Sequence, residues 1–315
     1  MQQQTMAKEQ TADFRGITIA VVAGDRREQE IARQAALSGA TVRAFGFPWP
    51  DQGIAGVEHT ADARSALRGA HFGLLPIPGS SADGALFAPA LGQKIIPDAG
   101  LLGAMAPGAH IFLGLANHVI EQAAKAASVT LHEYDGDKRL MYLRAPAIVE
   151  GILKVLIENT DFTIKGAQIG VVGQGTISSV LTKTLIAIGG QVNVFARNPI
   201  QRAAAMAFGA SARPLEKLAE QCPALDILIS CVPARVVDRA ILQRLPKRAL
   251  VVDVAAPPGG VDLASATELG LRNVWARGLG NRAPITVGAS QWSGLQERIQ
   301  QILASPASPL AVRSR

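Results

Sequence analysis

The chain has little cysteine, few histidines and no long apolar run. Only Cys222 and Cys231 occur among 315 residues, too few for a disulfide framework and not spaced as in metal sites. The five histidines are scattered without ligand spacing, so we expect no bound metal. No apolar run approaches the length that spans a bilayer, and residues 1–13 lack the apolar stretch of a signal peptide. We therefore expect a cytoplasmic protein without membrane association.

Aromatic residues are also scarce, which bears on how the basic charge is interpreted. The net charge is +6 and the pI is near 9.6, but aromatic residues make up only 4% of the chain. Few rings are therefore present for base stacking, and the basic residues are mixed with acidic ones along the sequence. We expect no nucleic-acid partner. A positive field favours anionic small molecules instead.

Apolar segments of strand length alternate with helical segments along the whole chain. A length of 315 residues with 48% hydrophobic residues favours two domains. The alternation predicts two doubly wound parallel sheets. The predicted strands are 17–23, 41–46, 71–76, 110–113 and 129–133 in the first half, and 168–172, 191–195, 226–230, 250–254 and 272–275 in the second.

The predicted domains are an N-terminal α/β substrate domain (1–144) and a Rossmann domain (145–286). A C-terminal helix and tail follow them (287–315). A polar stretch, 135–146, ends at Pro146 and leads into a predicted connecting helix, 147–158. The final helix, 287–303, is expected to return to the first domain, and the tail from Ser305 is expected to be disordered.

Residues 166–198 carry a strand, a glycine turn, a helix and a second strand. In such a unit the backbone at Gly173 and Gly175 can approach a pyrophosphate, and the helix start at Thr176 and Ile177 supplies free N–H groups. Ser178 stands where the fingerprint has its third glycine. The turn sits inside a complete strand–turn–helix–strand unit, so we predict a dinucleotide site here. The first domain has no second turn of this kind.

The end of the second strand bears on the choice of dinucleotide. The acidic residue that would bind the 2′-hydroxyl of NAD is missing, and Arg197 and Asn198 stand there instead. A basic residue suits a 2′-phosphate, so we predict NADP. An arginine at a strand end can equally be a solvated surface charge.

With these segments in place, the chain resembles the A subunit of dipicolinate synthase from about residue 17 to residue 303. Five sequence blocks carry the resemblance: GDRR (24–27), VEG (149–151), NTDFTIKG (159–166), DVAAPPGGVD (253–262), and GLG (278–280) followed by AP (283–284). Three positions depart from the family: Ser178, Ala23 and Gly280. The last two lie near the expected substrate cleft, so they bear on the substrate more than on the fold.

The resemblance implies an NADP-dependent oxidoreductase of dipicolinic acid biosynthesis, a pathway of sporulation. The implied reaction oxidises a dihydrodipicolinate-level ring, derived from 4-hydroxy-tetrahydrodipicolinate, to dipicolinate. The implied partners are a small dicarboxylate substrate and a flavoprotein-like B subunit. We also expect a homo-oligomer.

The expected cofactor residues lie at the carboxyl ends of the second domain's strands, where ligands of open α/β sheets bind. The pyrophosphate would contact the glycine turn, and the 2′-phosphate would contact the residues after the second strand. The full set is Gly173, Gly175, Thr176, Ile177, Arg197, Asn198, Val232, Pro233, Ala255 and Gly278.

The substrate and acid–base candidates have alternative structural roles beside the functional ones. Arg27 suits a carboxylate, but could be an exposed arginine at a helix start. Ser80 and Ser81 could donate to a second carboxylate or form a plain turn, and Asn117 could instead cap a helix.

Three residues are candidates for the general acid. Asp25 is also a helix cap, with Glu28 completing a capping box. Glu150 is also interpretable as a solvated helix glutamate, and His118 matches no family residue. Aromatisation supplies much of the driving force, so a strong catalytic base is not required.

Two other functions remain open on the sequence. One is another NADP-dependent two-domain dehydrogenase of a hydroxy or amino acid, although residues 275–290 contain neither His nor Lys. The other is a non-catalytic nucleotide-binding subunit that serves a partner.

Overall fold

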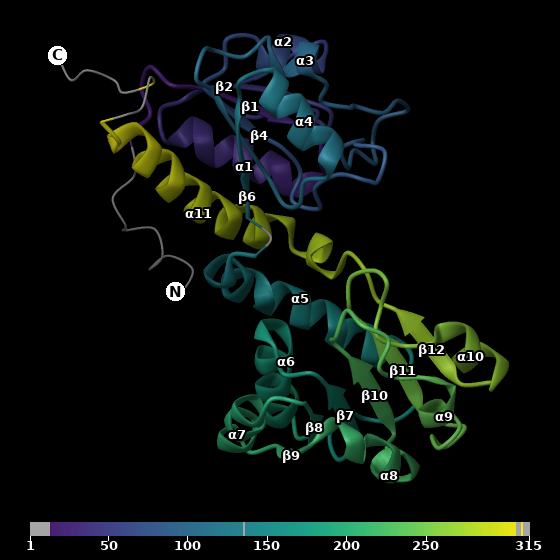
Figure 1. Cartoon of the computed structure of the whole chain (residues 1–315). Helices are drawn as coiled ribbons and strands as arrows, with labels where there is room; N and C mark the ends of the chain where they lie inside the picture. Colours follow the sequence, from purple (N-terminus) through teal and green to yellow (C-terminus); the bar gives the residue numbers. More distant parts are fainter. Residues whose placement is uncertain (1–12, 135, 307–309, 311–315) are drawn as a thin grey trace. The chain divides into compact units, whose positions relative to one another are not determined.

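The computed structural model describes residues 13–134, 136–306 and 310, which form two compact units (Figure 1). The first unit contains the chain up to Leu140 together with the chain from Ala283, and the second unit is Met141–Arg282. The N-terminal segment 1–12, which we expect to contain no signal peptide, lies outside the described residues. Most of the tail expected to be disordered, 307–309 and 311–315, lies outside them too.

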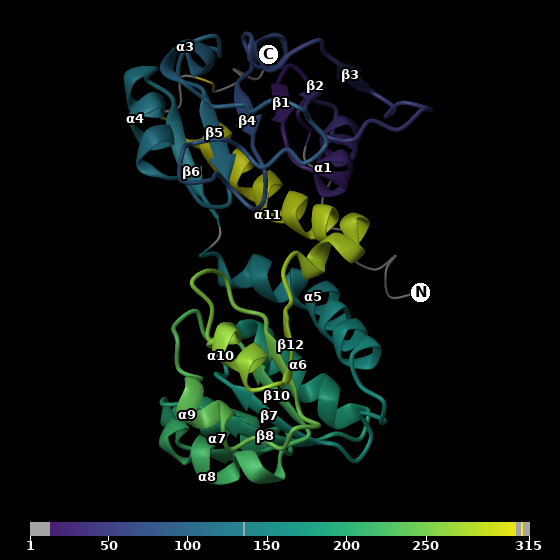
Figure 2. The same cartoon turned by 90° about the vertical axis from the view of Figure 1, so that its right-hand side faces the viewer.

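The first unit is built on a six-stranded, all-parallel sheet with the order β3-β2-β1-β4-β5-β6 (Figure 2). This order reverses between β1 and β4, which makes the carboxyl ends of those strands the topological switch point. The strands are β1 (Thr18–Val22), β2 (Thr41–Phe45), β3 (Val57–His59), β4 (Phe72–Leu74), β5 (His110–Leu113) and β6 (Thr130–Glu133).

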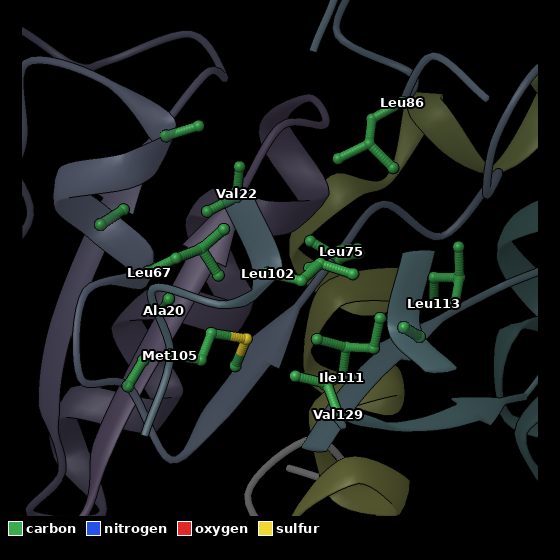
Figure 3. Close-up of a cluster of buried hydrophobic side chains, with 14 of the residues drawn as sticks. Ala20, Val22, Leu67, Leu75, Leu86, Leu102, Met105, Ile111, Leu113 and Val129 are labelled. Atoms are coloured by element: carbon green, nitrogen blue, oxygen red, sulfur yellow. The ribbon is translucent and has the colours of Figure 1, made fainter. Parts of the chain in front are cut away.

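Helices cover both faces of this sheet. One face forms the core drawn in Figure 3, where strand residues such as Ala20, Val22 and Ile111 pack with Leu67 and Leu102 from the covering helices. Both faces of β1 are buried, which explains its continuous apolar run. The helices are α1 (Arg26–Leu37), α2 (Ala63–Leu67), α3 (Ala99–Leu102), α4 (His118–Ala126) and α11 (Pro284–Ala304).

The C-terminal helix α11 belongs to the first unit, as predicted, and packs along α1. At Gly288 the two helices approach so closely that a Cβ would lie 2.5 Å from the Arg27 carbonyl oxygen. Phe14 packs edge-on against Trp292 of the same helix. The close approach at a glycine explains why this helix can return to the first sheet.

The second unit repeats the same topology. Its six-stranded parallel sheet has the order β12-β11-β10-β7-β8-β9, with the switch point between β7 and β10. The strands are β7 (Gln168–Val172), β8 (Gln191–Phe195), β9 (Ser211–Arg213), β10 (Ile227–Ser230), β11 (Leu250–Asp253) and β12 (Arg272–Trp275). The prediction of two doubly wound parallel sheets is confirmed.

The helices of the second unit differ from expectation mainly in α5. The others are α6 (Thr176–Ala187), α7 (Pro199–Ala207), α8 (Leu218–Gln221), α9 (Arg239–Leu242) and α10 (Leu263–Glu268). Helix α5 covers Lys138–Glu158, so the expectation of a start at residue 147 was wrong. Pro146 lies inside the helix and cannot donate to the Tyr142 carbonyl. Both residues are exposed, so water can take the place of the missing donor.

Two general properties concern the described residues only. No helix in this part of the chain is long and apolar enough to cross a membrane. Cys222 and Cys231 are both free thiols.

Candidate nucleotide and substrate sites

The turn after β7 has the geometry that the sequence predicts. Gly173 has a φ of +87°, and its N–H donates to the Phe195 carbonyl at 2.8 Å. A Cβ at Gly173 would lie 2.5 Å from Val232 Cγ2, so a side chain is excluded by conformation and by space. At Gly175 a Cβ would meet nothing within 4 Å, which leaves open space directly above the turn. The turn is therefore closed on the protein side and open on the other.

The helix that follows this turn starts without a cap. Gly175 is the N-cap of α6 and offers no side chain to the first N–H groups. Most other helices are capped by an aspartate or asparagine side chain. These caps are Asp25, Asp62, Asp98, Asn117, Asn198, Asp238 and Asp262. The first N–H groups of α6, including those near Thr176 and Ile177, thus have no side-chain cap and open space above the turn, a geometry that can accept an anion.

Ser178 stands in the place of the third fingerprint glycine. It is buried, and its hydroxyl donates to the Gly175 carbonyl at 3.4 Å. It also hydrogen-bonds with the thiol of Cys231, and burial raises the pKa of that thiol to about 12. The small serine therefore packs against the end of β10 without blocking the turn, and the thiol stays neutral.

Gln174, between the two glycines, carries no signal in the sequence pattern. Its side chain points into the unit, where Oε1 accepts from the Thr182 hydroxyl at 3.0 Å. Its Nε2 is buried and has no hydrogen-bond partner. The contact ties the glycine turn to the second turn of α6, and nothing in the sequence distinguishes this glutamine from an exposed one.

Arg197 and Asn198 follow β8 at the carboxyl edge of the same sheet. Arg197 is exposed, and no acidic side chain of the described residues pairs with it. Arg202 fixes the loop, because its Nη1 donates to the carbonyls of Ala196 and Arg197 at 2.8 and 2.6 Å. Asn198 caps α7 by accepting from the Ile200 N–H at 2.8 Å. Arg197 is thus a free guanidinium on a supported loop.

The remaining predicted cofactor residues follow β10, β11 and β12. Val232 packs on Gly173, and Pro233 next to it is exposed. Asp253 is fully buried and accepts from the N–H groups of Ala255, Gly260 and Val261 at 3.0, 2.7 and 3.0 Å. This carboxylate fixes the loop 254–260. Gly278 has a φ of +64°, so it also occupies a position that favours glycine.

In the first unit, two predicted site residues pair with each other. Asp25 caps α1 through the Arg27 N–H at 3.0 Å, and its carboxylate receives two bonds from the Arg27 guanidinium at 2.9 and 2.8 Å. The Arg27 side chain is 9% exposed and that of Asp25 is 13% exposed. Burial opposes the charge on Arg27, but the pair outweighs it and raises the pKa of the guanidinium.

Glu28 lies at the switch point of the first sheet. Its carboxylate accepts from the Asp25 N–H at 2.7 Å and from the Ile77 N–H at 3.0 Å. The residue is 1% exposed, and a Cβ on Gly24 would lie 2.3 Å from its Cδ. Burial raises the pKa of Glu28 to about 7. A carboxylate of the protein therefore occupies the helix start that a phosphate would need.

The predicted substrate residues in the loops of the first unit mostly form hydrogen bonds within their own turns and caps. The Ser81 hydroxyl donates to Asp83 at 2.7 Å, whereas the Ser80 hydroxyl is buried without a partner. Asn117 caps α4 through the Val119 and Ile120 N–H groups, and its amide donates to the Ser81 carbonyl at 2.8 Å. Of this group, Ser80 is the residue whose hydroxyl has no hydrogen-bond partner among the described residues.

The two other acid candidates lie on helices. His118 is the first residue of α4 and is exposed. Glu150 lies on α5, where its half-exposed carboxylate forms an ion pair with Arg282. Asp25 and Glu150 are thus both engaged in ion pairs within their own units.

Comparison with known proteins covers both units. Residues 18–134 match the family model described as the N-terminal domain of the dipicolinate synthase A subunit. Residues 156–268 match the model of shikimate/quinate 5-dehydrogenase, so the second unit is of dehydrogenase type.

The whole chain also has relatives of nearly its own length. It is 28% identical to the dipicolinate synthase A subunit of Bacillus subtilis over 291 residues, which is 92% of this chain and 98% of the relative. The crystal structure of the Bacillus subtilis protein has a TM-score of 0.84 at 26% identity, covering 93% of this chain and 99% of the other. Its counterpart from Bacillus halodurans has a TM-score of 0.83 at 26% identity, with 94% and 100% covered. Fold, length and both units agree, and the chain is similar to dipicolinate synthase A subunits along nearly its whole length.

Proposed function

We propose that this chain is an NADP-dependent dehydrogenase that acts as the A subunit of a dipicolinate synthase. Loss of water from 4-hydroxy-tetrahydrodipicolinate gives a dihydro ring, which the enzyme would oxidise to dipicolinate. The similarity to A subunits along both units and the dehydrogenase-type second unit support this function.

The observation that carries the proposal is the open start of α6. Gly175 leaves the first N–H groups of this helix without a side-chain cap and with no atom above the position of its Cβ. Gly173 lets the chain turn tightly beneath them. A pyrophosphate fits such a cradle, because the helix start supplies donors and a favourable dipole.

Arg197 supports NADP over NAD. It follows β8, where a Rossmann unit recognises the 2′ position of the ribose, and no acidic residue stands there to accept from a 2′-hydroxyl. An unpaired guanidinium binds a 2′-phosphate through charge-assisted hydrogen bonds. Arg202 supports the same loop by donating to the Arg197 carbonyl.

The oxidation removes a hydride and a proton from the dihydro ring, and NADP⁺, which the glycine turn and Arg197 would hold, would accept the hydride. The products are dipicolinate, NADPH and a proton, which balances the step. Asp25 and Glu150 are held in ion pairs, so neither is poised as a strong base. The proton can pass to water, because formation of the aromatic ring drives the reaction.

The ion pairs of the two acid candidates also make a second function worth testing. With Asp25 and Glu150 paired in the structure, a nucleotide-binding subunit that depends on a partner for catalysis is the alternative. We propose a B subunit as that partner, in line with the name of the relatives.

The test is conversion by the purified full chain. It would be supplied with 4-hydroxy-tetrahydrodipicolinate and NADP⁺, and both NADPH absorbance and dipicolinate would be followed. Formation of both in equal amounts is expected. Nucleotide binding without turnover, restored by adding the B subunit, would favour the partner-dependent alternative.

A further inference from the structure

An arginine at the carboxyl edge of the second sheet has no acidic partner. Arg277 follows β12, and its guanidinium carbon lies 5.3 Å from the centre of the Trp275 ring. The side chain is exposed, and the structure records no ion pair for it among the described residues. Arg27, the predicted carboxylate ligand of the first unit, is paired with Asp25, and Arg282, which follows Arg277 in the sequence, is paired with Glu150.

The ring beneath this arginine is fixed in place. The Trp275 indole N–H donates to the Ala255 carbonyl at 3.0 Å, which ties the ring to the loop that Asp253 organises. The ring also lies against Gly259, where a Cβ would be 3.6 Å from Cζ2. These contacts fix the orientation of the Trp275 ring beside the guanidinium.

The backbone on either side of Arg277 is fixed as well. The Ala276 N–H donates to the Asp253 carbonyl at 2.8 Å, which continues the β11–β12 pairing. Gly278 turns the chain with a φ of +64°, and Leu279 then packs on Gly151 so closely that a Cβ there would lie 2.9 Å from the Leu279 carbonyl oxygen. The backbone of Arg277 is thus fixed by the contacts of the residues before and after it.

The place of Arg277 in the sheet fits the substrate end of the nucleotide. The glycine turn follows β7 and Arg197 follows β8, so the nicotinamide half extends the other way, over β10 and β11. Strand β12 lies beyond them, about 10 Å from β10 at the usual strand spacing. A group held at the end of β12 is therefore next to the reacting end of the cofactor.

We propose that Arg277 binds a carboxylate of the substrate, with Trp275 as its positioning residue. This rests on the proposed function, since it assigns the dicarboxylate of that reaction to a specific residue. The cation–π contact with the ring places the guanidinium without using its N–H groups as hydrogen-bond donors to an acidic side chain. Those N–H groups can bind a carboxylate through two parallel hydrogen bonds, a geometry that a lysine cannot reproduce.

The experiment measures dipicolinate binding to the NADP-saturated full chain by calorimetry. Arg277→Ala is expected to weaken dipicolinate binding by about tenfold or more and to leave NADP affinity unchanged. Arg277→Lys should recover only part of the loss. The matched control is Arg272→Ala, an exposed arginine at the opposite end of the same strand, which should change neither ligand.

Trp275 is tested by kinetics. Trp275→Phe keeps a ring under the guanidinium and Trp275→Leu removes it, so the leucine variant should raise the KM for the substrate severalfold while kcat changes little. Equal KM values in both variants would contradict the positioning role.

Two outcomes separate the site from the function. If Arg277→Ala binds dipicolinate as tightly as the unaltered chain, the carboxylate site is wrong and the proposed function stands. If the unaltered chain binds NADP but not dipicolinate, the site and the proposed substrate are both wrong.

Discussion

The carboxylate of Glu28 accepts a hydrogen bond from the Ile77 N–H at 3.0 Å, across the switch point of the first sheet. Its other oxygen accepts from the N–H of Asp25, which follows Gly24 in the turn after β1. The two units share one strand order, yet only the second presents an open helix start there. In the first unit a buried side chain fills the place of a phosphate, which explains why we assign the nucleotide to the second.

Replacing Glu28 should change how stability depends on pH. The folded-state pKa is about 7 because of burial, against an ordinary value of 4.5. The folded chain therefore binds more protons than the unfolded chain between these values. The contribution of Glu28 is fully present below pH 4.5 and is lost as the pH rises through about 7.

The measurement is the free energy of unfolding of the chain and of Glu28→Gln at several pH values. Glutamine does not titrate, so only the unaltered chain should lose stability as the pH rises. Relative to Glu28→Gln, its free energy of unfolding should fall by on the order of 3 kcal/mol across this window. A difference that stays constant with pH would contradict the raised pKa.

Removing Asp25 should destabilise the first unit more than loss of a helix cap alone. Asp25→Ala deletes the cap of α1 and also leaves the buried Arg27 guanidinium without its partner. We expect a loss of about 3 kcal/mol or more. Asp62→Ala is the matched control, because Asp62 caps α2 at an exposed site, and it should cost about 1 kcal/mol. Equal losses in urea denaturation would show that the ion pair adds nothing.

The two glycines of the second unit's turn should respond differently to alanine. Gly173→Ala meets a positive φ and Val232, so it should lower the free energy of unfolding by about 2 kcal/mol or more. At Gly175 the φ is −82° and the space is open, so Gly175→Ala should leave stability nearly unchanged. Its methyl group would instead enter the phosphate space and weaken NADP binding. Unchanged NADP affinity in Gly175→Ala would place the phosphate elsewhere.

The sheets could be predicted because their strands are short, apolar and separated by clear turns. Strands β7, β8 and β12 begin and end where the sequence pattern predicts. Helix α5 was predicted too short, since Pro146 normally marks a boundary, and only the exposure of this side of the helix lets the proline stay inside it. Burial, which decides this, is a tertiary property.

The geometry of the candidate sites was predictable where the backbone alone determines it. Gly173 and Gly175 follow from the strand–turn–helix pattern, and Asp25 follows as a cap. Side-chain pairings were not predictable in the same way. The role of Arg27 in holding a substrate carboxylate stays a prediction, and its ion pair with Asp25 was not among the pairings expected from the sequence. Glu28 was predicted as the partner in a capping box, but its contact with Ile77 joins residues 49 positions apart, which no local pattern contains.

The most direct test of the nucleotide site is a titration of the purified chain with NADP and with NAD, repeated on Arg197→Ala. The control is Arg244→Ala, an exposed arginine in the connection that enters β11 at the opposite edge of the sheet. We predict that the unaltered chain prefers NADP and that Arg197→Ala weakens NADP binding by about tenfold or more, with NAD binding and the control unchanged. Equal binding of NADP before and after the Arg197 substitution would contradict the assignment of the 2′-phosphate, and no binding of either nucleotide would contradict the dehydrogenase function of this chain.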